Sequence, residues 1–171
     1  KKITENKRVS VFIDAANILY SQHTLGWEID YQKLLRYFRK NYRFQKAYFY
    51  SGKDSRNKKQ EQFFSRMRKF GYNVVTKEVK WIRDKNGKIL KGKGNLDIEL
   101  ALDLTHKATE YDIAFLLSGD SDFAPAISFV KRIKKKVIVI STRHHVAKEL
   151  VETANLFLPF DHLKKEIIRQ K

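Results

Sequence analysis

Short apolar runs alternate along this chain with longer segments in which apolar residues recur at helical spacing. Five runs rich in β-branched and aromatic residues predict strands at 9–13, 46–50, 73–75, 113–117 and 137–140. Three of them, VSVFI, IAFLL and VIVI, are almost continuously apolar, which is typical of strands buried on both faces of a parallel sheet.

The segments between these runs predict helices. They read YQKLLRYFRKN (31–41), KKQEQFFSRMRKFG (58–71), LDIELALDLTHKA (96–108) and FAPAISFVKRIKKK (123–136). Gly71 marks the expected C-terminal end of the second helix. Strands that alternate with helices predict an α/β fold with a mainly parallel central sheet and right-handed crossovers. Because no repeat or low-complexity linker interrupts the pattern, we expect one domain over residues 1–171.

One basic segment, 77–93, departs from this pattern. Two short β-like runs flank Asn86-Gly87, a dipeptide that favours a tight hairpin turn. The segment carries Trp81 and seven cations: Lys77, Lys80, Arg83, Lys85, Lys88, Lys91 and Lys93. We interpret it as a protruding basic arm. A solvated edge hairpin, whose lysines discourage aggregation, is the alternative, and both descriptions can hold together.

Composition adds a strong preference for anionic partners. Lys and Arg number 36 against 19 Asp and Glu, which gives a net charge of +17 and favours nucleic acid first and acidic membrane surfaces second. The chain has no cysteine, which excludes disulfides, thiolate metal sites and a cysteine nucleophile. Its start does not resemble a signal peptide, and no apolar run approaches the ~20 residues that span a bilayer. We therefore expect a soluble cytoplasmic protein without membrane association.

Acidic residues follow two of the apolar runs. Asp14 comes directly after VSVFI, and Asp120 and Asp122 follow IAFLL after Ser-Gly. Because parallel strands end at one edge of a sheet, these carboxylates converge if the two strands are neighbours. Asp97 opens the helical pattern at 96–108 on the apolar side that Leu100 continues.

Each acid also has a purely structural interpretation. Asp14 could cap a turn with Asn17, and Asp122 could be the N-cap of the helix from Phe123 to Ile133. Asp97 would complement a helix dipole. Asp120 has no obvious capping position. Together, however, clustered carboxylates repel one another unless a cation neutralises them, and Mg²⁺ and Mn²⁺ prefer such oxygen ligands.

Three segments in order carry a family resemblance. FIDAANI (12–18), KGNLDIELALD (93–103) and LLSGDSDFAPAI (116–127) closely resemble the NYN domains, the PIN-like nuclease group that includes LabA-like proteins. The resemblance covers about residues 8–163; VIVIS and ELVETANLFLPFDHL are similar to the family's last strand, helix and closing segment. It implies a three-layer α/β/α PIN-like fold and a ribonuclease site that depends on Mg²⁺ or Mn²⁺.

The resemblance also implies residue roles. Asp14, Asp97 and Asp120 would be metal ligands, and Asp122 a ligand directly or through water. Asn17 and Ser118 would orient ligands or a phosphate oxygen. The expected substrate is single-stranded RNA, preferred over DNA by the resemblance alone. The arm is longer than a minimal PIN-like domain requires, and would adjust either substrate grip or pairing in a homodimer.

Further residues are candidates for RNA contact. From the arm we expect Lys80, Trp81, Arg83, Lys88, Lys91 and Lys93, and from the predicted sheet edge Arg143. Ser141 and Thr142 at that edge could receive a phosphate, although N-capping is the preferred interpretation. Trp81 is a better candidate for base stacking than Trp27 or Tyr20, which we expect in core or rim packing.

Other function classes fit less well. A non-catalytic RNA-binding or regulatory module remains the main alternative, and the complete acid set favours the enzyme. A haloacid dehalogenase-like phosphatase needs Asp-x-Asp after the first strand, where this chain has Asp14-Ala-Ala. A P-loop or Rossmann nucleotide binder needs a glycine pattern that is absent after that strand.

Overall fold

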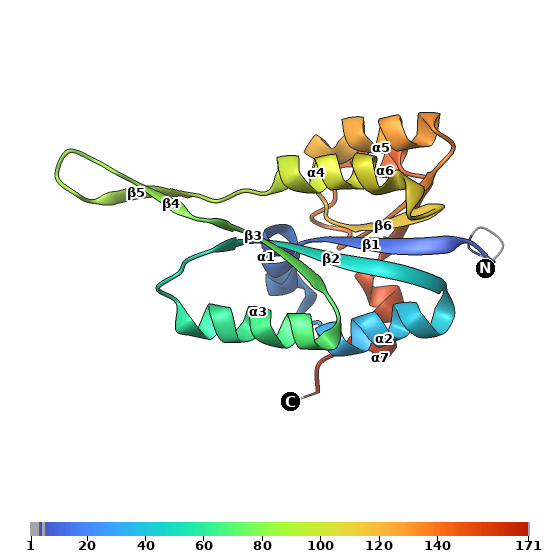
Figure 1. The fold of residues 1–171 in the computed structure, drawn as a ribbon, viewed down its shortest axis with the longest axis horizontal. Coiled ribbons are helices and arrows are strands. Elements are labelled where there is room, and N and C mark those ends of the chain that lie inside the picture. The colour runs from blue at the N-terminus through green and yellow to red at the C-terminus, as the bar shows by residue number, and fades with distance from the viewer. Residues whose placement is uncertain (1–3, 5, 171) are drawn as a thin grey trace.

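The computed structural model describes Thr4 and residues 6–170, apart from the side chains of Leu90, Lys91 and Lys93. Six parallel strands form the central sheet in the order β3-β2-β1-β6-β7-β8 (Figure 1). They are β1 (Arg8–Asp14), β2 (Arg43–Lys53), β3 (Asn73–Glu78), β6 (Ile113–Leu117), β7 (Lys136–Ser141) and β8 (Leu156–Pro159). The predicted α/β fold with a parallel sheet is confirmed.

Helices cover both faces of this sheet and complete three layers (Figure 1). One layer holds α1 (Ala15–Leu25), α2 (Tyr31–Asn41), α3 (Lys58–Phe70) and α7 (Lys164–Ile167). The other holds α4 (Asp97–His106), α5 (Ala124–Arg132) and α6 (Lys148–Thr153). Alternation along β1 explains the two cores, because Val11 and Ile13 face the first layer while Phe12 faces the second.

Two elements depart from the sequence expectation. The chain adds β8 beside β7, so the expectation that VIVIS forms the last strand is wrong. Pro159 ends β8, and an edge strand is where a residue without a backbone N–H is tolerated. Helix α1 was not predicted; it starts directly after β1, where the Asp14 side chain accepts a hydrogen bond from Asn17 N.

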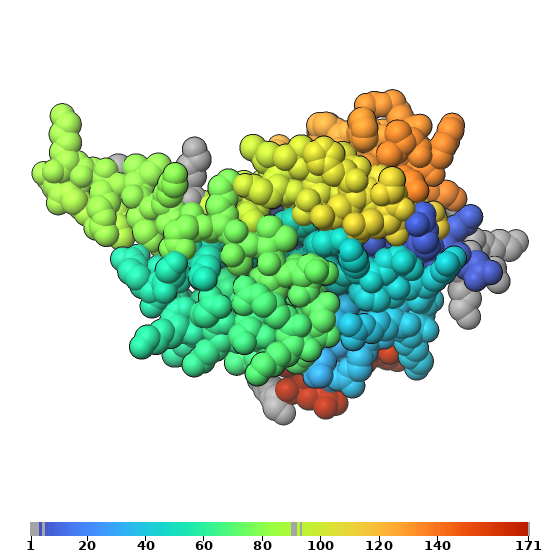
Figure 2. All heavy atoms as spheres, in the orientation of Figure 1, coloured from blue at the N-terminus to red at the C-terminus, as the bar shows by residue number. Residues whose placement is uncertain are grey.

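The basic arm is an antiparallel hairpin of β4 (Lys80–Arg83) and β5 (Ile89–Lys93) that projects from the body (Figures 1 and 2). At its tip, Asp84 Oδ1 accepts hydrogen bonds from Asn86 N and Lys88 N, and Gly87 has a φ of 79°. The predicted hairpin is therefore present. Lys77, at the start of the predicted arm, belongs to β3 instead and pairs with Glu99 of α4 at 2.7 Å.

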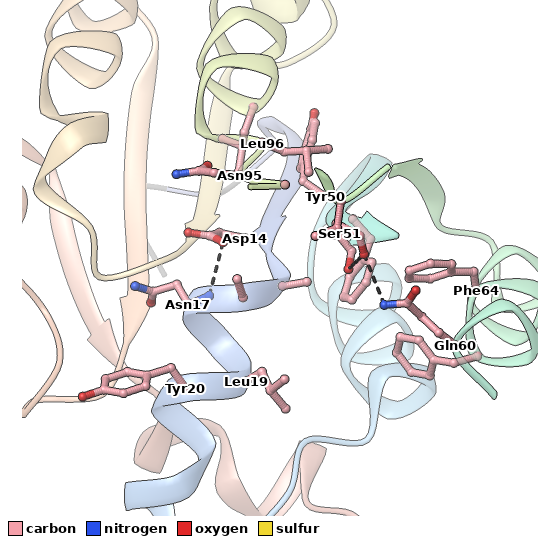
Figure 3. Close-up of a pocket in the computed structure, with 18 of the residues that line it drawn as sticks. Asp14, Asn17, Leu19, Tyr20, Tyr50, Ser51, Gln60, Phe64, Asn95 and Leu96 are labelled. Carbon is pink, nitrogen blue, oxygen red and sulfur yellow. Dashed lines mark hydrogen bonds between the residues drawn. The ribbon is translucent and has the colours of Figure 1, made fainter. Parts of the chain in front are cut away.

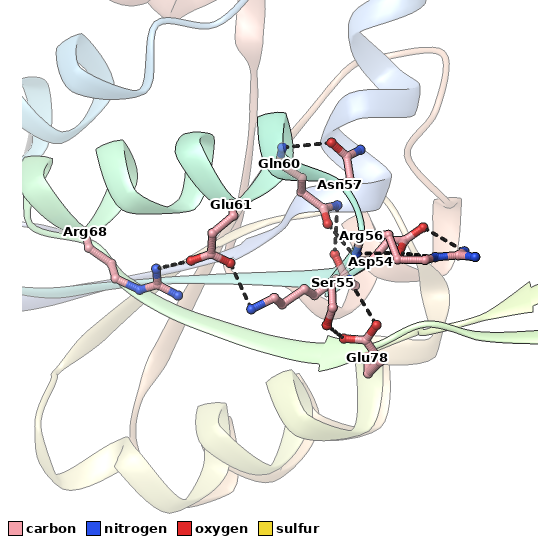
Figure 4. Close-up of polar contacts among 10 residues, drawn as sticks. Asp54, Ser55, Arg56, Asn57, Gln60, Glu61, Arg68 and Glu78 are labelled. Carbon is pink, nitrogen blue, oxygen red and sulfur yellow. Dashed lines mark hydrogen bonds and ion pairs between the residues drawn. The ribbon is translucent and has the colours of Figure 1, made fainter.

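The β2–α3 loop is braced by its own side chains (Figure 4). Gln60 accepts a hydrogen bond from Asp54 N and donates one to Gly52 O at the end of β2. Glu78 at the end of β3 accepts from both the backbone N–H and the hydroxyl of Ser55. These bonds hold the start of α3 against the C-terminal ends of β2 and β3.

Candidate functional site

The C-terminal ends of β1 and β6 lie side by side. Ile13 pairs with Leu117 in the parallel register, which brings Asp14 and Ser118 together at the next position. The Ser118 hydroxyl donates a hydrogen bond to Asp14 Oδ2 at 2.9 Å, and both side chains are buried. The strand adjacency required to bring the aspartates together is thus present.

The turn after β6 is fixed by side chains from both strands' ends. Gly119 N donates to Asn17 Oδ1 at 2.9 Å, and Asp120 N donates to Ser118 Oγ at 3.2 Å. Gly119 also packs against the loop after β7, where its carbonyl accepts from Ala147 N at 2.9 Å. A Cβ at position 119 would overlap the carbonyl oxygen of His145, so only glycine fits there.

Asp97 reaches the same place from the first residue of α4. Its backbone N–H donates to Asn95 Oδ1 at 2.7 Å, and the Asn95 amide donates back to its carboxylate. One carboxylate oxygen each from Asp97, Asp120 and Asp122 lies within 4.8 Å of the others. We call these three residues the acid cluster. Asn95 was not singled out from the sequence, and only its position two residues before Asp97 could have indicated it.

Burial and mutual repulsion disfavour charge in this region. Burial raises the pKa of Asp97 from its ordinary value, and the nearby Asp120 and Asp122 charges raise it further against the hydrogen bond from Asn95. Burial likewise raises the pKa of Asp14 to about 6, although Asn17 N–H and Ser118 donate to it. Asp97 and Asp120 add to that increase, so Asp14 lies within electrostatic reach of the acid cluster without belonging to it.

The acid cluster is suited to a divalent cation. Among the side chains that the structure describes, none of the three carboxylates, nor Asp14, forms an ion pair with a Lys, Arg or His. Carboxylate oxygens are the hard donors that Mg²⁺ and Mn²⁺ prefer. The donor set therefore fits such an ion, which would neutralise the repulsion among the three acids.

Capping roles differ from the sequence interpretation. Asp120 caps the 3₁₀ turn η2 (Ser121–Phe123) by accepting from Asp122 N at 2.9 Å. The N-cap position of α5 is Phe123, which makes no side-chain cap, so the capping role suggested for Asp122 is wrong. The helix begins through a 3₁₀ turn, which places the cap two residues earlier. Asp122 is exposed and its carboxylate is left for the cluster.

The loop after β7 lies at the same sheet edge. Ser141 and Thr142 are buried, and within the described residues neither hydroxyl has a hydrogen-bond partner. Helix α6 has Ala147 at its N-cap without a side-chain bond, so the preferred capping interpretation for Ser141 and Thr142 is wrong. Arg143 is exposed at this edge, and its predicted contact with RNA stays a prediction. In the same loop, His145 packs edge-on against Tyr20, with ring centroids 4.9 Å apart.

A cleft of about 910 Å³ opens beside the acid cluster (Figure 3). Asp14, Asn17 and Tyr20 line one side in Figure 3, and Gln60 and Phe64 of α3 line the opposite side. Asp97, Asp120, Gly92, Gly94 and Trp81 also line the cleft. The cleft therefore joins two of the three clustered acids to the base of the arm.

The three aromatic candidates for base stacking differ in their exposure to solvent. Trp27 is buried, with Lys164 Nζ 5.9 Å from its ring centroid, which confirms core packing. Tyr20 is 63% exposed at the cleft rim, and Trp81 is 42% exposed on the arm. The same arm carries four exposed cations: Lys80, Arg83, Lys85 and Lys88. The predicted contacts of Lys91 and Lys93 fall on side chains outside the described part of the structure.

Comparison with known proteins identifies relatives over most of the chain. The family model described as NYN domain matches residues 8–161. Low amplitude and bright protein LabA from Synechococcus elongatus is 33% identical over 164 residues, which cover 94% of this chain and 87% of that protein. A protein of unknown function from Vibrio parahaemolyticus has a crystal structure of the same fold, with a TM-score of 0.78 and 23% identity, covering 97% of this chain and 99% of that one.

No helix within the described residues has the length and apolarity needed to cross a bilayer.

Proposed function

The chain belongs to the NYN domain family, which is nuclease-related, and on this premise we propose that it is a metal-dependent ribonuclease that hydrolyses RNA phosphodiester bonds. The observation that carries the proposal is the acid cluster: three carboxylates from two separate elements, within 4.8 Å of one another and without a basic partner among the described side chains. A stable fold gains nothing from such repulsion, so a cationic ligand is its most economical explanation.

Asp97, Asp120 and Asp122 would hold Mg²⁺ or Mn²⁺. When bound, such an ion supplies charge neutralisation for the phosphate and a more acidic water. Asp14 would add a fourth carboxylate from the β1 side. Its two oxygens accept bonds from Asn17 N and Ser118 Oγ, and each oxygen keeps a second lone pair for a ligand.

Asn17 and Ser118 position the aspartates by accepting hydrogen bonds from the backbone of the turn that carries Asp120 and Asp122. Asn17 Oδ1 holds Gly119 N, and Ser118 Oγ accepts from Asp120 N while it donates to Asp14. Both side chains therefore fix the turn that carries Asp120 and Asp122. We assign them a positioning role, because the amide oxygen of Asn17 and the hydroxyl of Ser118 are both engaged in bonds that shape the turn.

Substrate attraction would come from the arm and the sheet edge. Lys80, Arg83 and Lys88 are exposed on the arm, and Arg143 is exposed beside the β7 end. Cations at these places would contact the phosphates on either side of the acid cluster. The combination of a basic surface and an acidic centre suits an enzyme that attracts a polyanion and cuts it at a metal. We propose single-stranded RNA in the cytoplasm as the substrate.

The test is cleavage of end-labelled single-stranded RNA with Mn²⁺, Mg²⁺ or EDTA. Wild type should cut with either metal and not with EDTA, and Asp120→Asn and Asp97→Asn should each abolish cutting. Glu166→Gln, which removes one exposed negative charge from α7, is the matched control and should cut normally. Cutting that survives Asp120→Asn would refute the assigned site. Retained RNA binding without cutting by wild type would instead favour a non-catalytic RNA-binding module.

A further inference from the structure

The indole ring of Trp81 packs against a glycine of the neighbouring strand of the arm. Trp81 pairs with Gly92 across the β4–β5 hairpin, and a Cβ at position 92 would lie 2.8 Å from Cζ3 of the indole ring. Only glycine at this position lets the ring lie so close to the neighbouring strand. One side of the indole is thus supported by backbone, while 42% of the residue stays exposed.

The base of the arm is held firmly against the sheet. Val79 N donates to Lys53 O at 2.8 Å, and added Cβ atoms at Gly94 and Gly52 would lie 2.6 Å from Val79 Cγ2 and 3.0 Å from Gly94 O. These close approaches fix the hairpin to the C-terminal end of β2. The indole is therefore presented at a defined place on the cleft wall rather than on a free strand.

The cross-strand partner of Trp81, Gly92, is close to the acid cluster along the chain. Asp97 follows Gly92 by five positions, a span of at most about 18 Å even when fully extended. Trp81, Gly92, Gly94, Asn95 and Asp97 all line the same cleft. An RNA strand with one phosphate at the acid cluster can therefore extend along that cleft to the indole.

The surroundings of Trp81 match one kind of occupant. Its strand also carries the exposed cations Lys80 and Arg83, of which Lys80 alternates to the opposite face, so an anionic chain is attracted to the arm that presents the indole. A single exposed tryptophan needs no partner by itself. Here, however, the ring is supported by the neighbouring strand, lines the cleft and belongs to a basic arm, which is how proteins hold unpaired bases.

We propose that Trp81 stacks on one unpaired nucleobase of the RNA strand whose phosphate lies at the acid cluster. The inference rests on the proposed function for the choice of RNA. It adds the requirement that the bound strand be single-stranded at this position, because a base within a duplex has no free face for the ring. Gly92 is a positioning residue in this subsite, since it sets how closely the indole lies on β5.

The test measures affinity in EDTA, so that no strand is cut. Fluorescent oligouridylate and an oligomer of the same length with abasic riboses are titrated with wild type, Trp81→Ala, Trp81→Phe and Ile82→Ala. Ile82 is the matched control, because it is exposed on the same strand and points to the opposite face. Circular dichroism and the urea midpoint verify that all variants are folded.

Trp81→Ala should weaken oligouridylate binding about 5-fold to about 150-fold, while Trp81→Phe keeps most of the affinity. Ile82→Ala should bind as wild type does. On the abasic oligomer all four proteins should bind alike, because only the phosphates remain. Equal binding of oligouridylate by wild type and Trp81→Ala overturns the subsite, as does an equal loss on the abasic oligomer.

The same proteins separate this inference from the nuclease proposal. RNA cutting by wild type with unchanged affinity in Trp81→Ala refutes the subsite and leaves the nuclease intact. A base-dependent loss in Trp81→Ala, together with no cutting by wild type under any metal, supports the subsite and refutes the nuclease.

Discussion

Replacing Asp14 with Asn should stabilise the metal-free fold at alkaline pH. Asp14 is 9% exposed, and burial is the largest cause that raises its pKa from 3.8 to about 6. A buried carboxyl with a raised pKa binds its proton more tightly in the folded state than in the unfolded state. Its ionisation therefore costs stability, and the cost is absent below the unfolded pKa and complete above the folded one.

The magnitude follows from the size of the shift. A rise from 3.8 to about 6 corresponds to about 3 kcal/mol at pH values well above 6, since each pKa unit is about 1.4 kcal/mol. Asparagine keeps an acceptor for Asn17 N, and its amide can donate to Ser118 after the hydroxyl rotates. The exchanged hydrogen bonds cost about 1–2 kcal/mol at every pH, so we expect a net gain of about 1–2 kcal/mol near pH 8 and a net loss of about 1–2 kcal/mol near pH 4, where Asp14 is protonated in the folded state.

The measurement is urea unfolding of wild type and Asp14→Asn in EDTA at several pH values. Asp112→Asn is the control of opposite sign, because hydrogen bonding to Arg8 lowers the pKa of Asp112 to about 2. That carboxylate contributes stability above pH 4, which is lost as the pH falls towards 2, so its removal should destabilise at neutral pH. An Asp14→Asn protein that is less stable than wild type near pH 8 would refute the reasoning.

Three further outcomes are expected. Mn²⁺ at about 100 times its Kd should stabilise wild type by about 2.7 kcal/mol in thermal unfolding, and Asp97→Asn should lose this response while Glu166→Gln keeps it. Gly119→Ala should lower the free energy of unfolding by about 1–3 kcal/mol or more and reduce RNA cutting, because its Cβ would overlap the carbonyl oxygen of His145. The double variant Lys80→Ala/Lys88→Ala should reduce the salt dependence of RNA binding by about 0.7 in log–log slope for each phosphate that is no longer neutralised; an unchanged slope would mean that other cations bind the phosphates.

The sequence predicted those elements whose pattern is local and strong. Helix α1 escaped because its buried residues are Ala15, Ile18 and Ser21, while Leu19 and Tyr20 lie on its exposed side. The sequence of this segment therefore lacks an apolar helical periodicity, although the segment forms a helix. Strand β8 is four residues long and is held by non-local bonds, among them Asn155 N to Val137 O. Pairing of this kind depends on the assembled sheet and has no signature within LFLP.

The site was predictable to the level of residue types and sheet edge. Parallel strands end at the same edge of a sheet, so the sequence alone predicts that Asp14 and Asp120 lie at one edge even though it does not give the strand order. The rule does not say which oxygens remain free. Asp14 is held by Asn17 and Ser118 and lies outside the acid cluster. Asn95 supports Asp97 through bonds that its place in KGNLDIELALD does not by itself reveal.

Asp120, and not Asp122, is the capping residue before α5, and this decides which carboxylate stays free for the site. A cap assigned to Asp122 would have tied its carboxylate to α5, whereas the 3₁₀ turn makes Asp120 the cap and leaves Asp122 exposed. Asp120 Oδ1 fixes the turn by accepting from Asp122 N, so Asp120 positions its neighbour as well as serving the cluster. Asp120→Asn can keep that backbone bond and remove only the charge. Loss of activity in this variant would therefore report on the carboxylate itself rather than on the shape of the turn.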